Sequence, residues 1–284
     1  MELITSVGEM QAWSAGERNR GRTIGFVPTM GALHEGHGRL LRTSRTHNDA
    51  TVLSIFVNPT QFDESSDYEK YPRTWDADLA AARRNDVSVV FAPSAAEMYP
   101  EGFDTHVRPG IVAQPMEGLH RPGHFEGVAT VVLKLFQSVA PHRAYFGAKD
   151  YQQLAVIRAM VRDLNIPVDV EMVPTVRDAD GLALSSRNAR LSPDDRRAAT
   201  VLHRALVAGR DAHVDGERRA EKIRSVVTAL LATEPRCRPE YVEVADAGTL
   251  ATTETTDTPS LVFVAARFGD VRLIDNIDLP GESA

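Results

Sequence analysis

Residues 24–37 read Ile-Gly-Phe-Val-Pro-Thr-Met-Gly-Ala-Leu-His-Glu-Gly-His. The apolar residues 24–27 predict a short buried strand, and the glycines and histidines that follow lead into a helix. Parallel α/β folds present phosphate sites in this way, because the first turn of such a helix has unpaired backbone N–H groups and a partial positive charge. This stretch therefore predicts both a fold class and a nucleotide site.

The two histidines of this stretch, His34 and His37, stand one helical turn apart, so both imidazoles can face the same phosphate chain. Gly31 and Gly36 allow the backbone to approach a ligand closely. The alternative is that the histidines cap the helix or face solvent. A metal centre is disfavoured, because the spacing is i, i+3 rather than the i, i+4 of zinc helices and no cysteine lies nearby.

Composition narrows the class of protein. The chain has 284 residues, of which 43% are hydrophobic, enough for one large domain or two modest ones. A formal charge of −7 and a pI near 5.7 argue against a nucleic-acid partner. The single cysteine, Cys237, has no base beside it, which argues against a nucleophile, and it suits a reducing cytosol. Without a signal pattern at residues 1–13 or an apolar run of about 20 residues, we expect a soluble cytoplasmic protein with no membrane partner.

Apolar runs alternate with helical patterns over the first two thirds of the chain. Strands are predicted at 24–27, 50–57, 87–91, 143–146 and 168–173, and helices at 38–46, 74–85, 128–140 and 152–164. This alternation predicts an α/β fold, a Rossmann-like parallel sheet with helices on both faces and ligands at the carboxyl ends of its strands. The Gly-x-Gly-x-x-Gly fingerprint is missing after the first predicted strand, which disfavours a dinucleotide site.

The pattern changes after Val176. Two helical stretches at 193–213 and 217–232 precede strand-like segments at 241–245, 261–266 and 271–274. Helices followed by a run of strands predict a smaller α+β domain. We therefore expect residues 1–176 to form a Rossmann-like catalytic domain and residues 177–284 a smaller α+β C-terminal lid domain.

Two further segments follow predicted strands and so share an edge of the sheet with the histidines. Asn58 and Gln61 follow strand 50–57 and offer amide groups to a small hydroxylated, carboxylated substrate, although a plain turn at Asn-Pro is the alternative. Lys149 and Asp150 follow strand 143–146. The lysine can neutralise phosphate charge, and the aspartate can bind a ribose hydroxyl or hold the lysine; a solvated ion pair is the alternative. Gln153 would point back toward the same site.

Two loops complete the candidates. Residues 184–187, Leu-Ser-Ser-Arg, form a flexible-looking segment that could close over a nucleotide and stabilise developing charge, although Ser-Ser-Arg is common and on its own favours a simple helix-capping turn. Residues 121–127, Arg-Pro-Gly-His-Phe-Glu-Gly, precede a helix and are read as a structural loop. No Gly-x-Ser-x-Gly motif is present, which disfavours a serine hydrolase.

Taken in order, residues 28–37, 56–62, 71–74, 146–153 and 185–188 resemble the pantoate–β-alanine ligases. The resemblance covers nearly the whole chain and is densest from 24 to 191. The His-x-Gly-His motif alone marks a wider nucleotidyltransferase superfamily. The resemblance implies that ATP and (R)-pantoate give an enzyme-bound pantoyl adenylate and pyrophosphate, and that β-alanine then displaces AMP to form pantothenate, on the route to coenzyme A. It also implies Mg²⁺ with ATP, and a homodimer.

The resemblance also implies roles for matching positions. His34 and His37 would contact the phosphates, with His37 the proton donor, and Lys149 and Arg187 would complete the catalytic set. Gln61 and Gln153 would hold pantoate, with Gln61 also bordering the β-alanine site, and Asn58 joins them as a substrate-binding candidate. The implied ATP site comprises Met30, Gly31, Ala32, Leu33, His34, Glu35, Gly36, His37, Gly147, Ala148, Lys149, Asp150, Val176, Leu184, Ser185, Ser186 and Arg187. No residue is predicted to bind a metal directly.

Two positions depart from the family pattern: Ala148 replaces a usual glutamate, and Ala183 stands where many members carry lysine. Neither is a main catalytic group. The alternatives are another nucleotidyltransferase, such as a cytidylyltransferase or an aminoacyl-adenylate former, and a nucleotide-sensing or scaffold protein that keeps the fold without catalysis. The acidic chain argues against a tRNA partner.

Overall fold

The computed structural model describes residues 1–63 and 65–280, and the chain forms two compact units. Unit 1 holds Met1–Ala113, Glu117–Ala148 and Gln153–Pro174. Unit 2 holds Gln114–Met116, Lys149–Gln152 and the chain from Thr175 onward. The division into two functional domains after Val176 stays a prediction.

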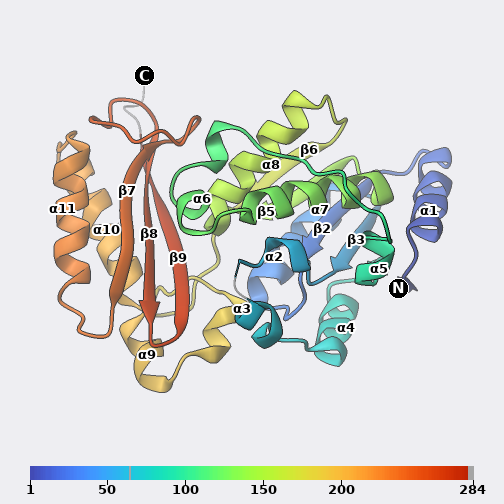
Figure 1. Ribbon diagram of the computed structural model, residues 1–284, viewed down its shortest axis with the longest axis horizontal. Coiled ribbons are helices and arrows are strands. Elements are labelled where there is room, and N and C mark those ends of the chain that lie inside the picture. The colour runs from blue at the N-terminus through green and yellow to red at the C-terminus, as the bar shows by residue number, and fades with distance from the viewer. Residues whose placement is uncertain (64, 281–284) are drawn as a thin grey trace. The chain divides into compact units, whose positions relative to one another are not determined.

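Unit 1 is built on a six-stranded sheet in which every neighbouring pair of strands is parallel (Figure 1). The strand order is β1-β4-β3-β2-β5-β6. The strands are β1 Glu2–Ile4, β2 Ile24–Thr29, β3 Ala50–Ile55, β4 Val89–Phe91, β5 Arg143–Gly147 and β6 Asp169–Val173. The predicted α/β class with a Rossmann-like parallel sheet is confirmed.

Helices cover both faces of this sheet, because successive strand residues point to opposite sides. Phe26 packs in a core with α7, where its ring lies 6.3 Å from Phe136, whereas Val27 belongs to a second core that includes Leu41 of α2. The helices are α1 Val7–Asn19, α2 Glu35–His47, α3 Ser65–Lys70, α4 Trp75–Arg84, α5 Ala95–Met98, α6 Glu117–His120, α7 His124–Val139 and α8 Tyr151–Asp163, the last beginning in unit 2, with short 3₁₀ turns η1 Pro59–Gln61, η2 Ile111–Ala113 and η3 Ala148–Asp150.

Strand β2 is the point at which the chain changes direction across the sheet. It pairs with β3, which follows it after α2, and on its other side with β5, which the chain reaches only after building β4. Open parallel sheets bind ligands in the crevice beyond the carboxyl ends of two such strands. The residues after Thr29 and after Phe146 therefore lie where a ligand is expected.

Unit 2 is an antiparallel sheet of β7 Arg238–Asp246, β8 Ser260–Phe268 and β9 Val271–Leu279. Helices α10 Val201–Val214 and α11 Ala220–Leu231 lie along one face of this sheet (Figure 1). The single helical stretch predicted at 193–213 is wrong in one respect: it divides into α9 Pro193–Ala198 and α10 at Ala199–Thr200. The predicted α+β character of this part is confirmed. Among the described residues, no helix is both long enough and apolar enough to cross a bilayer.

Candidate active site

The turn between β2 and α2 adopts an unusual backbone. Gly31 and Ala32 have positive φ angles of 81° and 51°. Glycine adopts this region without strain, whereas a residue with a Cβ such as Ala32 does so only when its surroundings hold it there. A Cβ added to Gly31 would also lie 3.0 Å from Asp78 Oδ2. The turn is therefore shaped by close contact with α4.

The carboxylate of Asp78 holds this turn. Its Oδ2 accepts from the Ala32 N–H at 3.0 Å and its Oδ1 from the Leu33 N–H at 2.8 Å, and the hydroxyl of Thr74 donates to Oδ1 at 3.2 Å. Asp78 is only 2% exposed. Asp78 was not among the predicted site residues. The sequence did contain a signal for this role, because Asp78 lies on a face of α4 where its neighbours are apolar.

His34 and His37 cap α2 reciprocally. His34 is the N-cap residue, and its Nδ1 accepts from the Gly36 N–H at 3.2 Å, while Nδ1 of His37 accepts from the His34 N–H at 3.3 Å. The ring centroids are 4.1 Å apart. The capping alternative is thus correct, and it does not exclude phosphate binding. Because each Nδ1 accepts, the proton of each neutral ring lies on Nε2, where it is a hydrogen-bond donor for an anion.

Asn58 and Gln61 are both buried, but their side chains are engaged differently. Asn58 Nδ2 donates to Gln61 Oε1 and to Gly127 O, each at 3.1 Å, and Tyr99 donates from its hydroxyl to Asn58 Oδ1 at 2.7 Å. Gln61 Nε2 donates to Met30 Sδ at 3.0 Å. That Asn58 touches substrate stays a prediction; its bonds in the protein favour a role in orienting Gln61.

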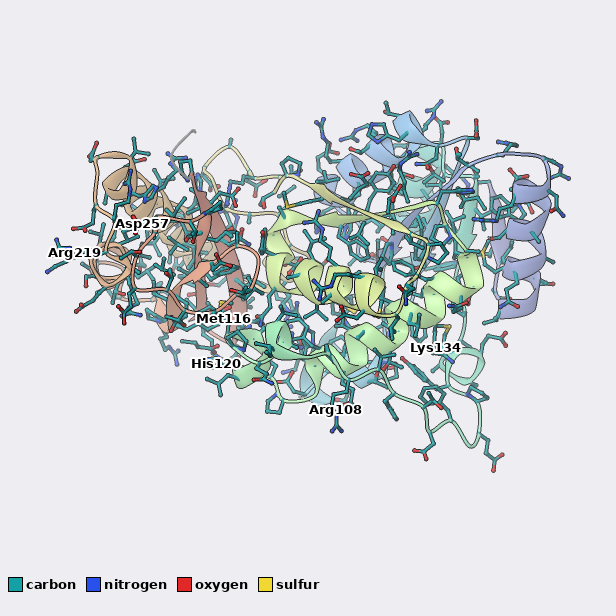
Figure 2. The ribbon with its side chains drawn as sticks, turned by 90° about the horizontal axis from the view of Figure 1, so that it is seen from above. Arg108, Met116, His120, Lys134, Arg219 and Asp257 are labelled. Atoms are coloured by element: carbon teal, nitrogen blue, oxygen red, sulfur yellow. The ribbon has the colours of Figure 1, made fainter. Side chains whose placement is uncertain are left out.

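Tyr99 is well placed to act as a neutral donor to Asn58. Burial raises its pKa, although hydrogen bonds to Thr60 and Asn58 act in the opposite direction. Lys134 of α7, labelled in Figure 2, lies with its Nζ 5.8 Å from the centroid of the Tyr99 ring and 4.6 Å from that of Phe103. Cation–π contacts of this kind help to fix the ring.

The segment 121–127, which was predicted to be a loop, supports the backbone of Gln61. Gln61 O accepts from His124 Nδ1 at 2.7 Å and from the Arg121 guanidinium at 3.2 Å. Arg121 also donates to Asp63 at 3.0 Å. Burial, the largest single effect, would raise the pKa of Asp63, but the hydrogen bond and the charge of Arg121, with smaller contributions from its own backbone and His124, together lower this pKa. The prediction of a structural loop holds only for residues 121–123, because residues 124–127 form the first turn of α7. The segment is attached to a predicted substrate residue through its contacts with Gln61.

In unit 2, Lys149 and Asp150 form the expected pair, with Nζ 3.3 Å from Oδ1. The Lys149 side chain is largely buried, with 16% exposed. Its backbone carbonyl accepts from Asn276 Nδ2 of β9 at 2.8 Å. Gly147 and Ala148, which precede the pair, and Gln153, which follows it, belong to unit 1.

The segment 184–187, expected to be flexible, directly follows a hydrogen-bonded hairpin, and its flexibility stays a prediction. Arg177 and Ala183 form an antiparallel bridge, and the Leu184 N–H donates to Val176 O at 3.0 Å. Ser185 then caps the 3₁₀ helix η4 Ser186–Arg190 by accepting from the Arg187 N–H at 3.3 Å. The capping alternative for this motif is therefore correct. The hairpin fixes the backbone position of Leu184, from which the chain continues to Arg187.

The predicted site residues fall into two groups. Unit 1 brings Met30, His34 and His37 into one loop–helix start, with Gln61 in contact with Met30. Unit 2 holds Lys149 and the hairpin that leads to Arg187. In the part of the chain that the structure describes, no group of three or more His, Cys, Asp or Glu side chains could hold a metal ion.

Comparisons with known proteins agree on one family. The family model for pantoate-beta-alanine ligase matches residues 2–278. The chain is 50% identical over 276 residues to the pantothenate synthetase of Roseiflexus sp. (strain RS-1), covering 97% of this chain and 98% of that one. It is 48% identical over 282 residues to the pantothenate synthetase of Geobacter sulfurreducens, covering 99% and 100%.

Solved structures give the same answer. The crystal structure of pantothenate synthetase from Thermus thermophilus matches with a TM-score of 0.93 at 45% identity, over 98% of this chain and 99% of that chain. The pantoate-beta-alanine ligase of Francisella tularensis, solved in complex with beta-gamma ATP and beta-alanine, matches with a TM-score of 0.80 at 33% identity over the whole of both chains.

Proposed function

The chain belongs to the pantoate–β-alanine ligase family, and from this premise we propose how its own residues join pantoate to β-alanine with ATP as co-substrate. Family membership removes the cytidylyltransferase and non-catalytic alternatives. The observation that carries the proposal is the reciprocal cap of His34 and His37, which sets the proton of each neutral ring on Nε2 at the start of α2, beside the switch point of the sheet.

The reaction proceeds in two steps. A carboxylate oxygen of pantoate attacks the α-phosphorus of ATP, the bond to the β-phosphate oxygen breaks, and pyrophosphate leaves. The amine of β-alanine then attacks the carbonyl carbon of the pantoyl adenylate, AMP departs, and the amine gives up a proton. A free carboxylate is a poor acyl donor, and the mixed anhydride with AMP supplies a good leaving group. No protein nucleophile is required.

Unit 1 supplies donors for the first step. His34 and His37 donate from Nε2 to phosphate oxygens as charge builds on them, and His37 acts as the proton donor. Gln61 and Gln153 bind the hydroxyl and carboxylate groups of pantoate. The contact of Gln61 with Met30 and the support of its carbonyl by Arg121 favour a fixed orientation for this amide.

Unit 2 supplies the cations. Lys149 and Arg187 reduce the repulsion between the pantoate carboxylate and the triphosphate, and an ammonium or guanidinium group does this best when solvent is excluded. Asp150 accepts from a ribose hydroxyl, and Val176 contacts adenine. The other ATP contacts implied by the family, from Met30 to Gly36 and at Gly147, Ala148 and residues 184–186, belong to the same proposal.

The proposed metal and assembly follow from the family alone. The family resemblance pairs Mg²⁺ with ATP, and we propose that the oxygens of the ATP phosphates would hold this ion, as they commonly do. We further propose a cytoplasmic homodimer. Size-exclusion chromatography with light scattering tests this assembly, and a monomer at micromolar concentration contradicts it.

Isotope exchange between pyrophosphate and ATP tests the mechanism. Exchange should require pantoate but not β-alanine, and AMP should appear only when β-alanine is added. His37→Ala and Lys149→Ala should each slow exchange by about 10²-fold or more while the fold persists. Formation of ADP would reject the adenylate, and wild-type exchange in both variants would remove these residues from the mechanism.

A further inference from the structure

We propose that Asn276 is a positioning residue for Lys149, and that β9 holds both cationic segments of unit 2 in one framework. The inference rests on the proposed role of Lys149 in adenylate formation. It concerns a residue near the end of the chain, far in sequence from every motif of the predicted site.

The first link is the bond to the lysine backbone. Asn276 is 7% exposed, and its Nδ2 donates to Lys149 O at 2.8 Å across 127 residues of sequence. Lys149 lies in the 3₁₀ turn η3, which is only three residues long. A bond from a strand of the sheet therefore fixes the backbone from which the ammonium group extends.

The second link runs from the neighbouring residue to the hairpin. Asp275 is 3% exposed and pairs with both terminal nitrogens of Arg177, at 2.5 and 3.0 Å. Arg177 also donates to Gly181 O at 3.2 Å and to Asn276 O at 3.3 Å. The hairpin that leads to Arg187 is thus attached to Asp275 and Asn276 of β9, and Asn276 is the residue that binds Lys149.

The third link joins the Asp275 side chain to the backbone of Asn276. The Asn276 N–H donates to Asp275 Oδ1 at 2.8 Å, so the carboxylate that binds Arg177 also orients the backbone of Asn276. A shift in either segment is therefore transmitted to the other through one dipeptide.

The chemistry of these positions favours function over folding alone. The other buried residues of β9, Val271, Leu273 and Leu279, are apolar and pack in the core of unit 2. A buried ion pair contributes little net stability compared with apolar residues of similar volume, because removing charges from water is costly. Two adjacent buried polar residues are therefore explained better by the need to fix Lys149 and the hairpin than by packing.

A double-mutant cycle tests the inference. Asn276→Ala should slow pyrophosphate–ATP exchange by about tenfold, the scale of one lost hydrogen bond, and should lower the unfolding temperature no more than the control variant below does. In a Lys149→Ala background the same change should slow exchange by less than about twofold, since Asn276 acts only through Lys149. Asn276→Asp keeps the size of the side chain without its N–H donors, and it should slow exchange at least as much.

The matched control is Thr256→Val, which removes a buried hydrogen bond to His213 Nδ1 elsewhere in unit 2. It should change the unfolding temperature but leave exchange unaltered. Exchange at the wild-type rate in both Asn276 variants, or an equal loss with and without Lys149, would overturn the inference and leave the proposed function intact. If Lys149→Ala alone has no effect, the proposed role of Lys149 fails, and the positioning role of Asn276 fails with it.

Discussion

Replacing Gly127 by alanine should move the segment that carries Gln61. Gly127 lies in α7, directly against the 3₁₀ turn η1, and its own carbonyl accepts from Asn58. A Cβ added there would lie 2.6 Å from the carbonyl carbon of Thr60 and 2.8 Å from the nitrogen of Gln61. Because both atoms belong to the backbone, no side-chain rotation can relieve the contact.

The cost follows from the kind of contact. Forcing extra atoms into a packed site destabilises a protein by about 1–3 kcal/mol, and the better helix propensity of alanine offsets up to about 1 kcal/mol of this. A net loss of about 1–2 kcal/mol corresponds to a fall in Tm of about 2–8 °C for a domain of this size. A displacement of Gln61 by about 1 Å should raise KM for pantoate by about tenfold or more.

Thermal unfolding and pyrophosphate–ATP exchange, measured against pantoate and then against ATP, check both parts. Gly8→Ala is the matched control, because among the described residues no atom lies within 4 Å of a Cβ added there in α1. It should leave the kinetics unchanged and raise Tm slightly. If Gly127→Ala has the same Tm and the same KM for pantoate as the wild type, the close packing of α7 on η1 does not position the substrate.

Three further outcomes are expected. Asp78→Ala leaves two backbone N–H groups of the turn before α2 without their acceptor, so the free energy of unfolding should fall by about 2–4 kcal/mol and the KM for ATP should rise. Asp78→Asn should have smaller effects, and an unchanged KM for ATP in both variants would refute the anchoring role. Burial raises the pKa of the Cys237 thiol to about 11, so at pH 8 iodoacetamide should label this thiol about 10²-fold more slowly than a free cysteine. Mass spectrometry can follow the labelling, and rapid labelling would contradict the burial of the thiol. Hydrogen bonds from Arg219, an exposed residue labelled in Figure 2, lower the pKa of Glu217 to about 2. The contribution of these bonds to stability should therefore be complete at pH values above the ordinary glutamate pKa of 4.5 and should be lost as the pH falls toward 2. An NMR titration of Glu217 that Arg219→Ala leaves unchanged would disprove the pairing.

Local patterns were sufficient to predict most of the fold. The apolar runs at 24–27 and 143–146 are long and continuous enough to identify buried parallel strands, and both appear in the centre of the sheet. Strand β1 was missed because it has only three residues and two of them are exposed. The break at Ala199–Thr200 was missed because alanine and arginine favour helix on both sides of it, and the local sequence carries no glycine or proline there.

The site was predicted only where its chemistry is contiguous in sequence. The spacing of His34 and His37 is enough to mark them as a pair on one face of a helix. Whether they cap the helix or bind a ligand depends on which ring nitrogen makes a hydrogen bond, and the spacing does not reveal this. Asp78 and Asn276 were not found, because the backbone groups of the site that their side chains bind lie 45 or more residues away along the chain. Their roles follow from tertiary contacts that no local pattern encodes.

The use of imidazole as the N-cap of α2 has a consequence for turnover. Serine, threonine, aspartate and asparagine are the usual N-caps, and an aspartate there would repel a polyanion. Neutral ring nitrogens satisfy the end of the helix without cancelling its electropositive field. These caps do not involve ATP, so we expect the start of α2 to keep its structure both before ATP arrives and after pyrophosphate departs.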